Sequence, residues 1–312
     1  MTGLAAHRIR DGLGRFLDSD FIYSFRRSPA VVVAFAVTVV FMLSALFAPW
    51  IVPHNTYEVM TLNLSDAFLP PSWIEGGKFA YLFGTDDQGR DVFSTIILGM
   101  RVSLLVGFLA VLFAMTLGIS LGLIAGYVGG TLDAVIMRVA DVQLSFPAIL
   151  IVLLIDGVAR GLLPRDMHDR VVVYVIVLAI GLTGWVQFAR TVRGSTLVEK
   201  NKEYVQSARL IGLHPGLILF RHVLPNVMGP VLVIATLNLA LAILQESTLS
   251  FLGVGVPPTE PSLGTLISVG NNFLFSGEWW MAIFPGVFLV VLVLSVNFLG
   301  DWLRDALNPK LR

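Results

Sequence analysis

The sequence contains no cysteine and few charged residues, and each shortage excludes a class of protein. Without cysteine there is no disulfide framework, no thiolate nucleophile and no thiolate zinc site. Asp, Glu, Lys and Arg make up only 13% of the 312 residues, whereas apolar residues make up 56%. Because so little charge cannot cover the surface of a water-soluble domain of this size, we predict an integral membrane protein.

The sequence also lacks the features of a nucleic-acid-binding protein, a metalloprotein or an ATPase. The formal net charge is zero, so no basic field is available for nucleic acid. The five histidines have no metal-ligand spacing, and no GxxxxGK[ST] phosphate-binding loop is present. We therefore expect no catalytic residue, no metal and no cofactor in this chain; if ATP drives the protein, partner subunits must bind the ATP and Mg²⁺.

Long apolar runs are what the sequence has in abundance. A bilayer-spanning helix needs about 20 mostly apolar residues. Six segments reach that length, which predicts an all-α protein with the transmembrane helices 30–52, 102–127, 134–157, 171–189, 223–245 and 279–300. The third is the least regular, because it contains Arg138, Asp141 and Asp156. Arg138 and Asp141 lie three residues apart, which favours a local ion pair on one helix.

The distribution of Lys and Arg predicts the orientation of these helices. Basic residues are retained on the cytoplasmic side. With both termini in the cytoplasm, that side carries 15 of the 21 basic residues and the opposite side carries six. We therefore predict a cytoplasmic N-terminus and a cytoplasmic C-terminus.

This topology divides the chain into segments with different roles. Residues 1–29 alternate apolar and basic positions at helical spacing, which predicts an amphipathic helix at the cytoplasmic membrane surface, in contact with lipid. The remaining predicted segments are the first transmembrane helix 30–52, an external loop 53–100, a core 101–305 that includes a basic inner loop 190–225 and an external loop 251–278, and a cytoplasmic tail 306–312.

Two features inside the predicted spans leave alternatives open. Gly118, Gly122, Gly126 and Gly130 recur every four residues, and the more economical interpretation is close helix packing within one bundle. Glu246, at the outer end of the fifth span, either lines a translocation pathway or lies at headgroup depth and caps the helix or loop that follows.

The inner loop contains the most specific motif of the sequence. It reads Glu203-Tyr-Val-Gln-Ser-Ala-Arg-Leu-Ile-Gly212 and, after nine residues, His222-Val-Leu-Pro225. This pattern resembles the EAA loop of bacterial ABC import permeases: Glu-Ala-Ala, three residues, Gly, nine residues, Ile, any residue, Leu-Pro. Three positions depart from it, since Gln206 and Ser207 replace Glu and Ala, and His222 stands at the Ile position. The spacing predicts a short helix, a turn at Gly212 and a return to the membrane near Pro225.

Further stretches, in the expected order, resemble the C-type permease subunit of dipeptide and oligopeptide importers. They are Arg27-Ser-Pro29, Phe83-Gly-Thr-Asp-Asp-Gln-Gly-Arg-Asp91, Gly126-Tyr-Val-Gly-Gly130, Glu246-Ser-Thr-Leu-Ser-Phe-Leu-Gly-Val-Gly255 and Gly300-Asp-Trp-Leu-Arg-Asp-Ala-Leu-Asn-Pro309. The resemblance implies the type I ABC importer permease fold and an inner-membrane location.

The resemblance also implies partners and a role for the inner loop. The partners are a B-type permease subunit, two cytosolic ATPase subunits and an external solute-binding protein. The residues that would couple the spans to the ATPases are Glu203, Gln206, Ser207, Ala208, Gly212, Leu224 and Pro225. Peptides are the expected substrate, with nickel or another small solute as an alternative within the family, and an ion-coupled secondary carrier as the rival from another class.

Overall fold

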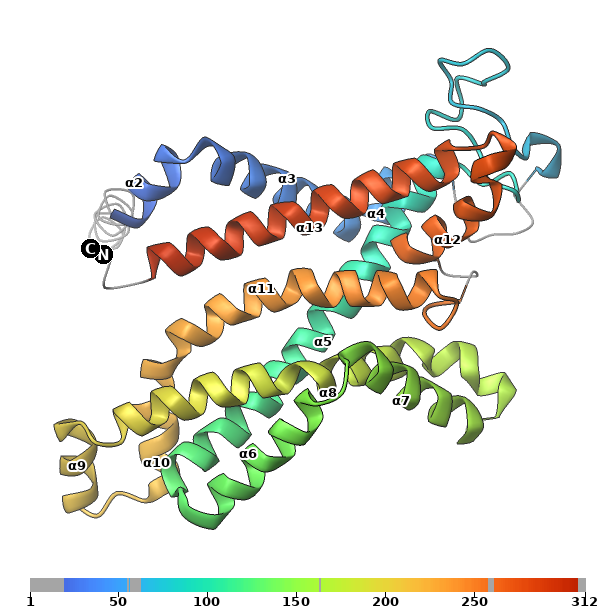
Figure 1. The fold of residues 1–312 in the computed structure, drawn as a ribbon. Helices are drawn as coiled ribbons and strands as arrows, with labels where there is room; N and C mark the ends of the chain where they lie inside the picture. The colour runs from blue at the N-terminus through green and yellow to red at the C-terminus, as the bar shows by residue number, and fades with distance from the viewer. Residues whose placement is uncertain (1–19, 55, 57–62, 163, 258–260, 308–312) are drawn as a thin grey trace, which may run out of the picture.

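The computed structural model describes residues 20–54, 56, 63–162, 164–257 and 261–307. Within these ranges the regular secondary structure is helical, apart from one isolated bridge between Thr85 and Asp91 (Figure 1). The helices are α2 (Asp20–Arg27), α3 (Pro29–Leu46), α4 (Ala48–Ile51), η2 (Leu64–Asp66), α5 (Val92–Val128), α6 (Gly130–Leu144), α7 (Ala148–Leu162), α8 (Arg165–Glu199), α9 (Glu203–Leu210), α10 (Pro215–Ile218), η3 (Leu219–Val223), α11 (Leu224–Phe251), α12 (Leu263–Phe273), η4 (Leu274–Ser276) and α13 (Trp280–Ala306).

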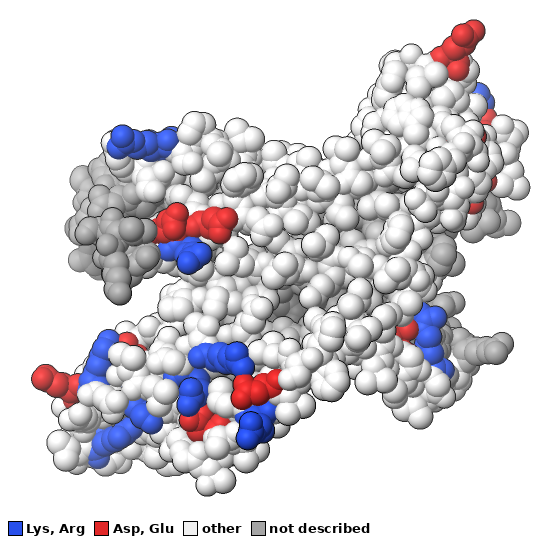
Figure 2. Space-filling view, viewed as in Figure 1, with Lys and Arg blue, Asp and Glu red and all other residues white. Residues whose placement is uncertain are grey.

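The long helices run between two ends of the molecule. The beginning of α2, the short helix α9 and the end of α13 lie at one end, whereas α12 and the loop before α5 lie at the other (Figure 1). On the face seen in Figure 2, acidic and basic residues gather at both ends, with an uncharged band between them. This is the charge pattern of a protein whose middle lies in hydrocarbon.

Among the described residues, five helices are long and apolar enough to cross a membrane, or up to six if a bent helix pair forms one span. The predicted amphipathic segment 1–29 lies mostly outside the described residues; α2 and the start of α3 are its described part. The predicted tail 306–312 also lies mostly outside them.

The bent pair is α6 and α7, where the sequence predicts one continuous span at 134–157. The axes of the two helices differ by 93°. Pro147 explains the break, because proline has no N–H to donate and disfavours helical geometry at the residue before it. The sequence predicts an ion pair between Asp141 and Arg138, but the Asp141 carboxylate instead accepts a hydrogen bond from Arg190 of α8 at 2.5 Å.

Several helices extend beyond the apolar runs that predict them. The helix α5 starts at Val92, ten residues before the predicted span, because the Asp91 carboxylate caps it by accepting from the Ser94 N–H at 3.0 Å. The final part of the predicted external loop 53–100 is therefore helical. The predicted loop 251–278 contains the helix α12, whose Leu263 and Leu266 are buried.

The glycine stripe of α5 packs against α8, in the most extensive contact between any two described helices. A Cβ on Gly118, Gly122 or Gly126 would lie within 2.5–2.7 Å of atoms of α8. Gly130 is different, because no atom lies within 4 Å of such a Cβ. Three of the four glycines thus serve the close packing predicted for the stripe, and the backbones of α5 and α8 approach closely because side chains are absent there.

This packing predicts that replacement by alanine lowers the stability of the protein at Gly122 but not at Gly194. Gly122→Ala places a methyl group 2.6 Å from the Ala189 carbonyl oxygen and should destabilise the protein by about 1–3 kcal/mol. Gly194→Ala on the exposed side of α8 meets nothing within 4 Å and should not lower stability. The measurement is the thermal unfolding midpoint of each purified variant in detergent, and equal midpoints would contradict the packing role.

Candidate functional site

The segment between α8 and α11 contains the short helix that the motif predicts. Three residues separate the helix α9 (Glu203–Leu210) from the end of α8 at Glu199. After the turn at Gly212, the chain continues through α10 and the π-helical turn η3 into α11, which carries Pro225 in its first turn. The structure therefore has the predicted helix, turn and return, although α8 occupies the first ten residues of the predicted loop 190–225.

Gly212 has the positive φ that the motif predicts. Its φ is +79°, a left-handed conformation that side chains other than Asn rarely adopt. The turn is closed by the Gly212 N–H, which donates to the Arg209 carbonyl at 3.0 Å, and by the Leu213 N–H, which donates to the Ala208 carbonyl at 3.1 Å. A Cβ on Gly212 would meet no atom within 4 Å, so the restriction on this position is conformational and not one of space.

The helix α9 has one buried face and one exposed face. Val205 and Ala208 are buried, whereas the side chains of Glu203, Gln206 and Ser207 are exposed. Of the other predicted residues, Leu224 is half-buried and Pro225 is exposed.

Two apolar residues beside the turn are exposed, and the motif did not single them out. The exposed fractions are 88% for Leu210 and 75% for Ile211. The two residues form an adjacent apolar pair at an otherwise polar end of the molecule.

A cluster of polar side chains ties α9 to the neighbouring long helices. The Glu199 carboxylate accepts hydrogen bonds from Tyr204 and from Lys202, both at 2.6 Å. Asn226 of α11 donates to the Tyr204 hydroxyl oxygen at 3.2 Å. Burial, together with the hydrogen bond to Glu199, raises the pKa of Tyr204 to about 12, so its hydroxyl stays protonated and donates to Glu199. These hydrogen bonds join α9 directly to the end of α8 and the start of α11.

Further contacts fix the end of α8 to α6 and α5. The Arg193 guanidinium binds the Asp133 carboxylate of α6 through two hydrogen bonds, at 2.5 and 2.7 Å. The Lys200 ammonium donates to the Gly126 carbonyl at the end of α5 at 2.7 Å. Because Asp133 and Arg193 are 60 residues apart in sequence, no local pattern indicates this pair.

Glu246 lies within α11, five residues before this helix ends at Phe251, and has no exposed surface. Its carboxylate accepts hydrogen bonds from Ser103 of α5 and from Ser250, both at 2.7 Å. The Leu263 N–H at the start of α12 donates in turn to the Ser103 hydroxyl oxygen at 3.3 Å. In this structure Glu246 therefore joins α5, α11 and α12 and does not face an open pathway.

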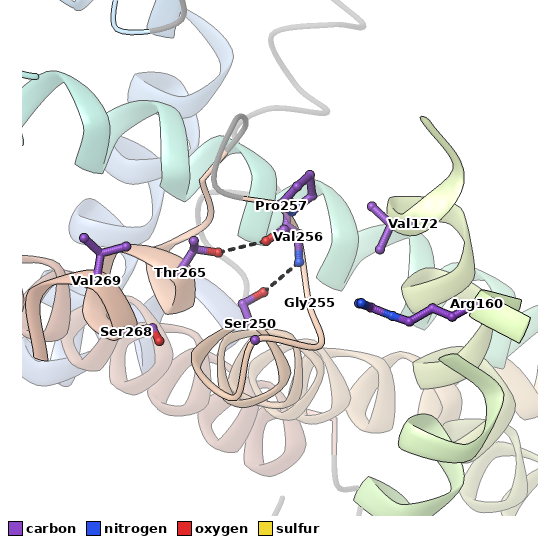
Figure 3. Close-up of a pocket in the computed structure, with 10 residues that line it drawn as sticks. Arg160, Val172, Ser250, Gly255, Val256, Pro257, Thr265, Ser268 and Val269 are labelled. Atoms are coloured by element: carbon purple, nitrogen blue, oxygen red, sulfur yellow. Dashed lines mark hydrogen bonds between the residues drawn. The ribbon is translucent and has the colours of Figure 1, made fainter. Parts of the chain in front are cut away.

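A cavity of about 310 Å³ adjoins this network at the end of the molecule where α12 lies. Figure 3 shows the Arg160 side chain extending from α7 toward the loop at Gly255 and Val256. The Arg160 Nε donates to the buried Asp156 carboxylate at 2.6 Å. The Ser250 hydroxyl, which binds Glu246, also accepts from the Val256 N–H at 3.2 Å, so the network reaches the cavity wall.

The segment before α5 forms a compact module at the same end. The Asp66 carboxylate binds Lys78 and accepts from the Tyr81 hydroxyl at 3.1 Å. The hydrogen bond from Lys78 holds the pKa of Asp66 below its usual value. The side chain of Phe79 in this module is 97% exposed, as is Phe275 beside α12.

Two known protein families match different segments of the chain. Residues 118–312 match the family described as binding-protein-dependent transport system inner membrane component, and residues 18–71 match the N-terminal TM domain of oligopeptide transport permease C.

Several relatives are similar over almost the full length. The dipeptide transport system permease protein DppC of Escherichia coli K12 is 40% identical over 94% of this chain and 93% of its own length. DppC of Haemophilus influenzae is 37% identical over 94% and 95%. The oligopeptide transport system permease protein OppC of Bacillus subtilis is 38% identical over 94% and 90%.

A solved structure shows the same fold. An inward-facing structure of the MetNI methionine ABC transporter matches with a TM-score of 0.54 and 19% identity, over 69% of this chain and 97% of that chain. Long apolar helices with charge at both ends, together with the family match over residues 118–312 and the full-length relatives, define a multi-pass membrane permease. The chain belongs to the family of binding-protein-dependent transport system inner membrane components and is a multi-pass protein of the bacterial inner membrane.

The contacts of Glu246 predict how the protein responds to its replacement. Glu246→Gln keeps the size and the hydrogen-bonding capacity of the side chain, so assembly should stay close to normal. Glu246→Ala leaves buried hydroxyls of Ser103 and Ser250 without this partner and should cost about 1–3 kcal/mol. The measurement is the thermal unfolding midpoint of the purified permease.

Thr248→Ala is the matched control, because the Thr248 hydroxyl donates only to the Leu244 carbonyl of its own helix. If Glu246→Ala and Thr248→Ala unfold at the same temperature as the native protein, Glu246 does not join the three helices.

Proposed function

We propose that this chain is the C-type permease subunit of an ATP-driven, binding-protein-dependent importer of dipeptides or oligopeptides, and that it forms half of the translocation pathway. The observation that carries this proposal is the full-length similarity, 37–40% identical, to permeases named for dipeptide and oligopeptide transport. Nickel or another small solute remains the alternative substrate in this family. An ion-coupled carrier is not favoured, because the matches are to binding-protein-dependent permeases.

The proposed partners are a B-type permease subunit, two ATPase subunits that bind ATP and Mg²⁺, and an external solute-binding protein. The chain itself is non-catalytic in this proposal. The exposed Leu210 and Ile211, with Gln206 and Ser207 on the same short helix and turn, are the surface that fits into a cleft of the ATPase. Apolar side chains supply the contact area, and the polar residues around them fix the orientation.

The mechanism we propose transmits a movement of α9 into the long helices. When the ATPases close on ATP, α9 moves with them. The hydrogen bonds among Glu199, Tyr204 and Asn226 make α8 and α11 follow, because breaking them would leave a partly buried carboxylate without its partners. Hydrolysis then allows the helices to return.

The opposite end of the molecule supplies the proposed landing surface for the binding protein. It comprises the external segments 53–100 and 251–278. The aromatic residues that we propose for the contact are Trp73, Phe79 and Phe275, which are exposed, and Tyr81 and Phe273, which are half-buried. Glu246, on this side of the bundle, would hold α12 in place during outward opening.

The turn at Gly212 gives the sharpest test of coupling. Gly212→Val forces a β-branched residue into a left-handed conformation at a cost of about 1–3 kcal/mol, which should misplace Leu210 and Ile211. We expect normal membrane insertion but loss of substrate-stimulated ATPase activity and of uptake. The measurement uses the purified four-subunit complex with its binding protein, beside uptake by cells.

Gly212→Asn is the control, since Asn tolerates positive φ and the site has room for its side chain. It should retain most of both activities. Normal stimulated ATPase and normal uptake by Gly212→Val would show that this turn is not the coupling element.

The proposed orientation predicts the sidedness of two exposed serines. Ser207 on α9 and Ser276 beside α12 lie at opposite ends of the molecule, and the chain has no cysteine of its own. In intact spheroplasts a membrane-impermeant maleimide should label Ser276→Cys, whereas Ser207→Cys should react only after permeabilisation. The reverse pattern would invert the topology, and with it the assignment of α9 to the cytoplasm.

A further inference from the structure

We infer that a cavity lined by the neutral amide side chains of Gln187, Asn238 and Gln245 is where the peptide backbone contacts this subunit during transport. The cavity has a volume of about 130 Å³ and is bounded by α5, α8, α11 and the break between α6 and α7. The inference rests on the proposed peptide substrate and adds the residues that would touch it.

The three amides come from two helix faces that meet at this cavity. Asn238, Leu241 and Gln245 recur on one face of α11, and Ile180, Thr183 and Gln187 recur on one face of α8. Both helices are candidate membrane spans. A polar side chain within a span is costly, and such residues commonly mark a substrate pathway.

The polar atoms at this cavity are only partly used within the protein. The Asn238 Nδ2 donates to the Gln187 Oε1 at 3.1 Å and to the Ile234 carbonyl at 3.0 Å. Among the described residues, no hydrogen bond engages the Asn238 Oδ1, the Gln187 Nε2 or the side chain of Gln245. The cavity therefore offers both hydrogen-bond donors and hydrogen-bond acceptors.

A fourth amide near the cavity, Gln143, differs because both of its polar atoms are engaged within the protein. Gln143 of α6 accepts from the Trp185 indole N–H at 2.7 Å and donates to the Leu182 carbonyl at 2.5 Å. Its two polar atoms fasten the end of α6 to α8. Gln143 is thus a structural amide, and it is not among the residues that line the cavity.

The break between α6 and α7 is a second, independent observation at the same place. Leu144 and Ala148, on either side of the break, line the cavity. Ser145, Phe146 and Pro147 between them are non-helical and exposed. Non-helical backbone at membrane depth is tolerated only where protein covers it or where it lines a water-filled cavity. This position fits a pathway wall whose opposite side is supplied by the partner permease.

The chemistry of the cavity matches the part that all peptides share. No Asp, Glu, Lys or Arg is among the described residues that line it. Amides pair with backbone N–H and C=O groups whatever the side chains of the peptide, so the wall would hold the backbone weakly without selecting for charge. Selection among peptides then falls to the binding protein.

Photo-crosslinking tests the contact directly. Leu241 in the cavity and Leu294 in an apolar groove between α3 and α13 are similarly exposed, at 47% and 50%. Each is replaced by p-benzoylphenylalanine in the complete transporter, reconstituted in liposomes with its binding protein and a radiolabelled tripeptide. During ATP turnover, irradiation should label the variant at position 241 at least tenfold more than that at position 294. Equal labelling at the two positions, while the tripeptide is taken up normally, would overturn the inference.

Substitution of the amides provides the second readout. Asn238→Leu and Gln187→Leu should lower tripeptide uptake at least tenfold, while the ATPase stimulated by the loaded binding protein stays within twofold of normal. Asn238→Gln should restore most of the uptake. The matched control is Asn297→Leu, an amide of α13 that does not line the cavity, and its uptake should be unchanged.

The outcomes separate this inference from the proposed function. If the native transporter imports nickel and no peptide, the proposed substrate fails and the inference fails with it. If peptides are imported normally by both leucine variants, only the inference fails.

Discussion

The close approach of α5 and α8 is the contact on which the rest of the arrangement depends. Three glycines on α5 let the two backbones meet with no side chain between them. In lipid the hydrophobic effect does not drive helices together, so packing of this kind has to supply the attraction. An ion pair between Arg193 of α8 and Asp133 of α6, and the hydrogen bond from Lys200 to the Gly126 carbonyl of α5, then fix the C-terminal end of α8. Because α8 leads directly into α9, the position of α9 follows from this packing.

The position of α9 in turn depends on a few polar contacts and one glycine conformation. Tyr204 and Glu199 hold its start, and the left-handed Gly212 reverses the chain after its end. A short helix has little stability of its own, so its orientation is set by these contacts and by the burial of Val205 and Ala208. A surface held at both ends moves as a unit with the helices to which it is attached, as the proposed coupling requires.

Local patterns in the sequence predicted the parts of the fold that local physics determines. Apolar runs located the long helices, and the spacing around Gly212 predicted its turn, because positive φ is a property of that residue and its neighbours. Contacts between distant segments were not predictable in this way. The predicted ion pair between Arg138 and Asp141 was wrong, because Arg190 approaches Asp141 only in the folded bundle. The break at Pro147 was missed, because apolar content does not show whether a helix is continuous.

The distribution of polar groups through the bundle separates a structural role from the proposed transport role. Glu246 is buried, and its carboxylate accepts hydrogen bonds from the hydroxyls of Ser103, Ser247 and Ser250, so its polar atoms are engaged by the protein itself. The amides of Gln187, Asn238 and Gln245 border a cavity and retain hydrogen-bonding capacity among the described residues. A buried carboxyl group with internal partners stabilises one arrangement of helices, whereas a partly engaged amide can exchange water for a passing backbone at little cost. Glu246 therefore holds the bundle together, and the uncharged polar residues of α8 and α11 are the ones that we propose face the pathway.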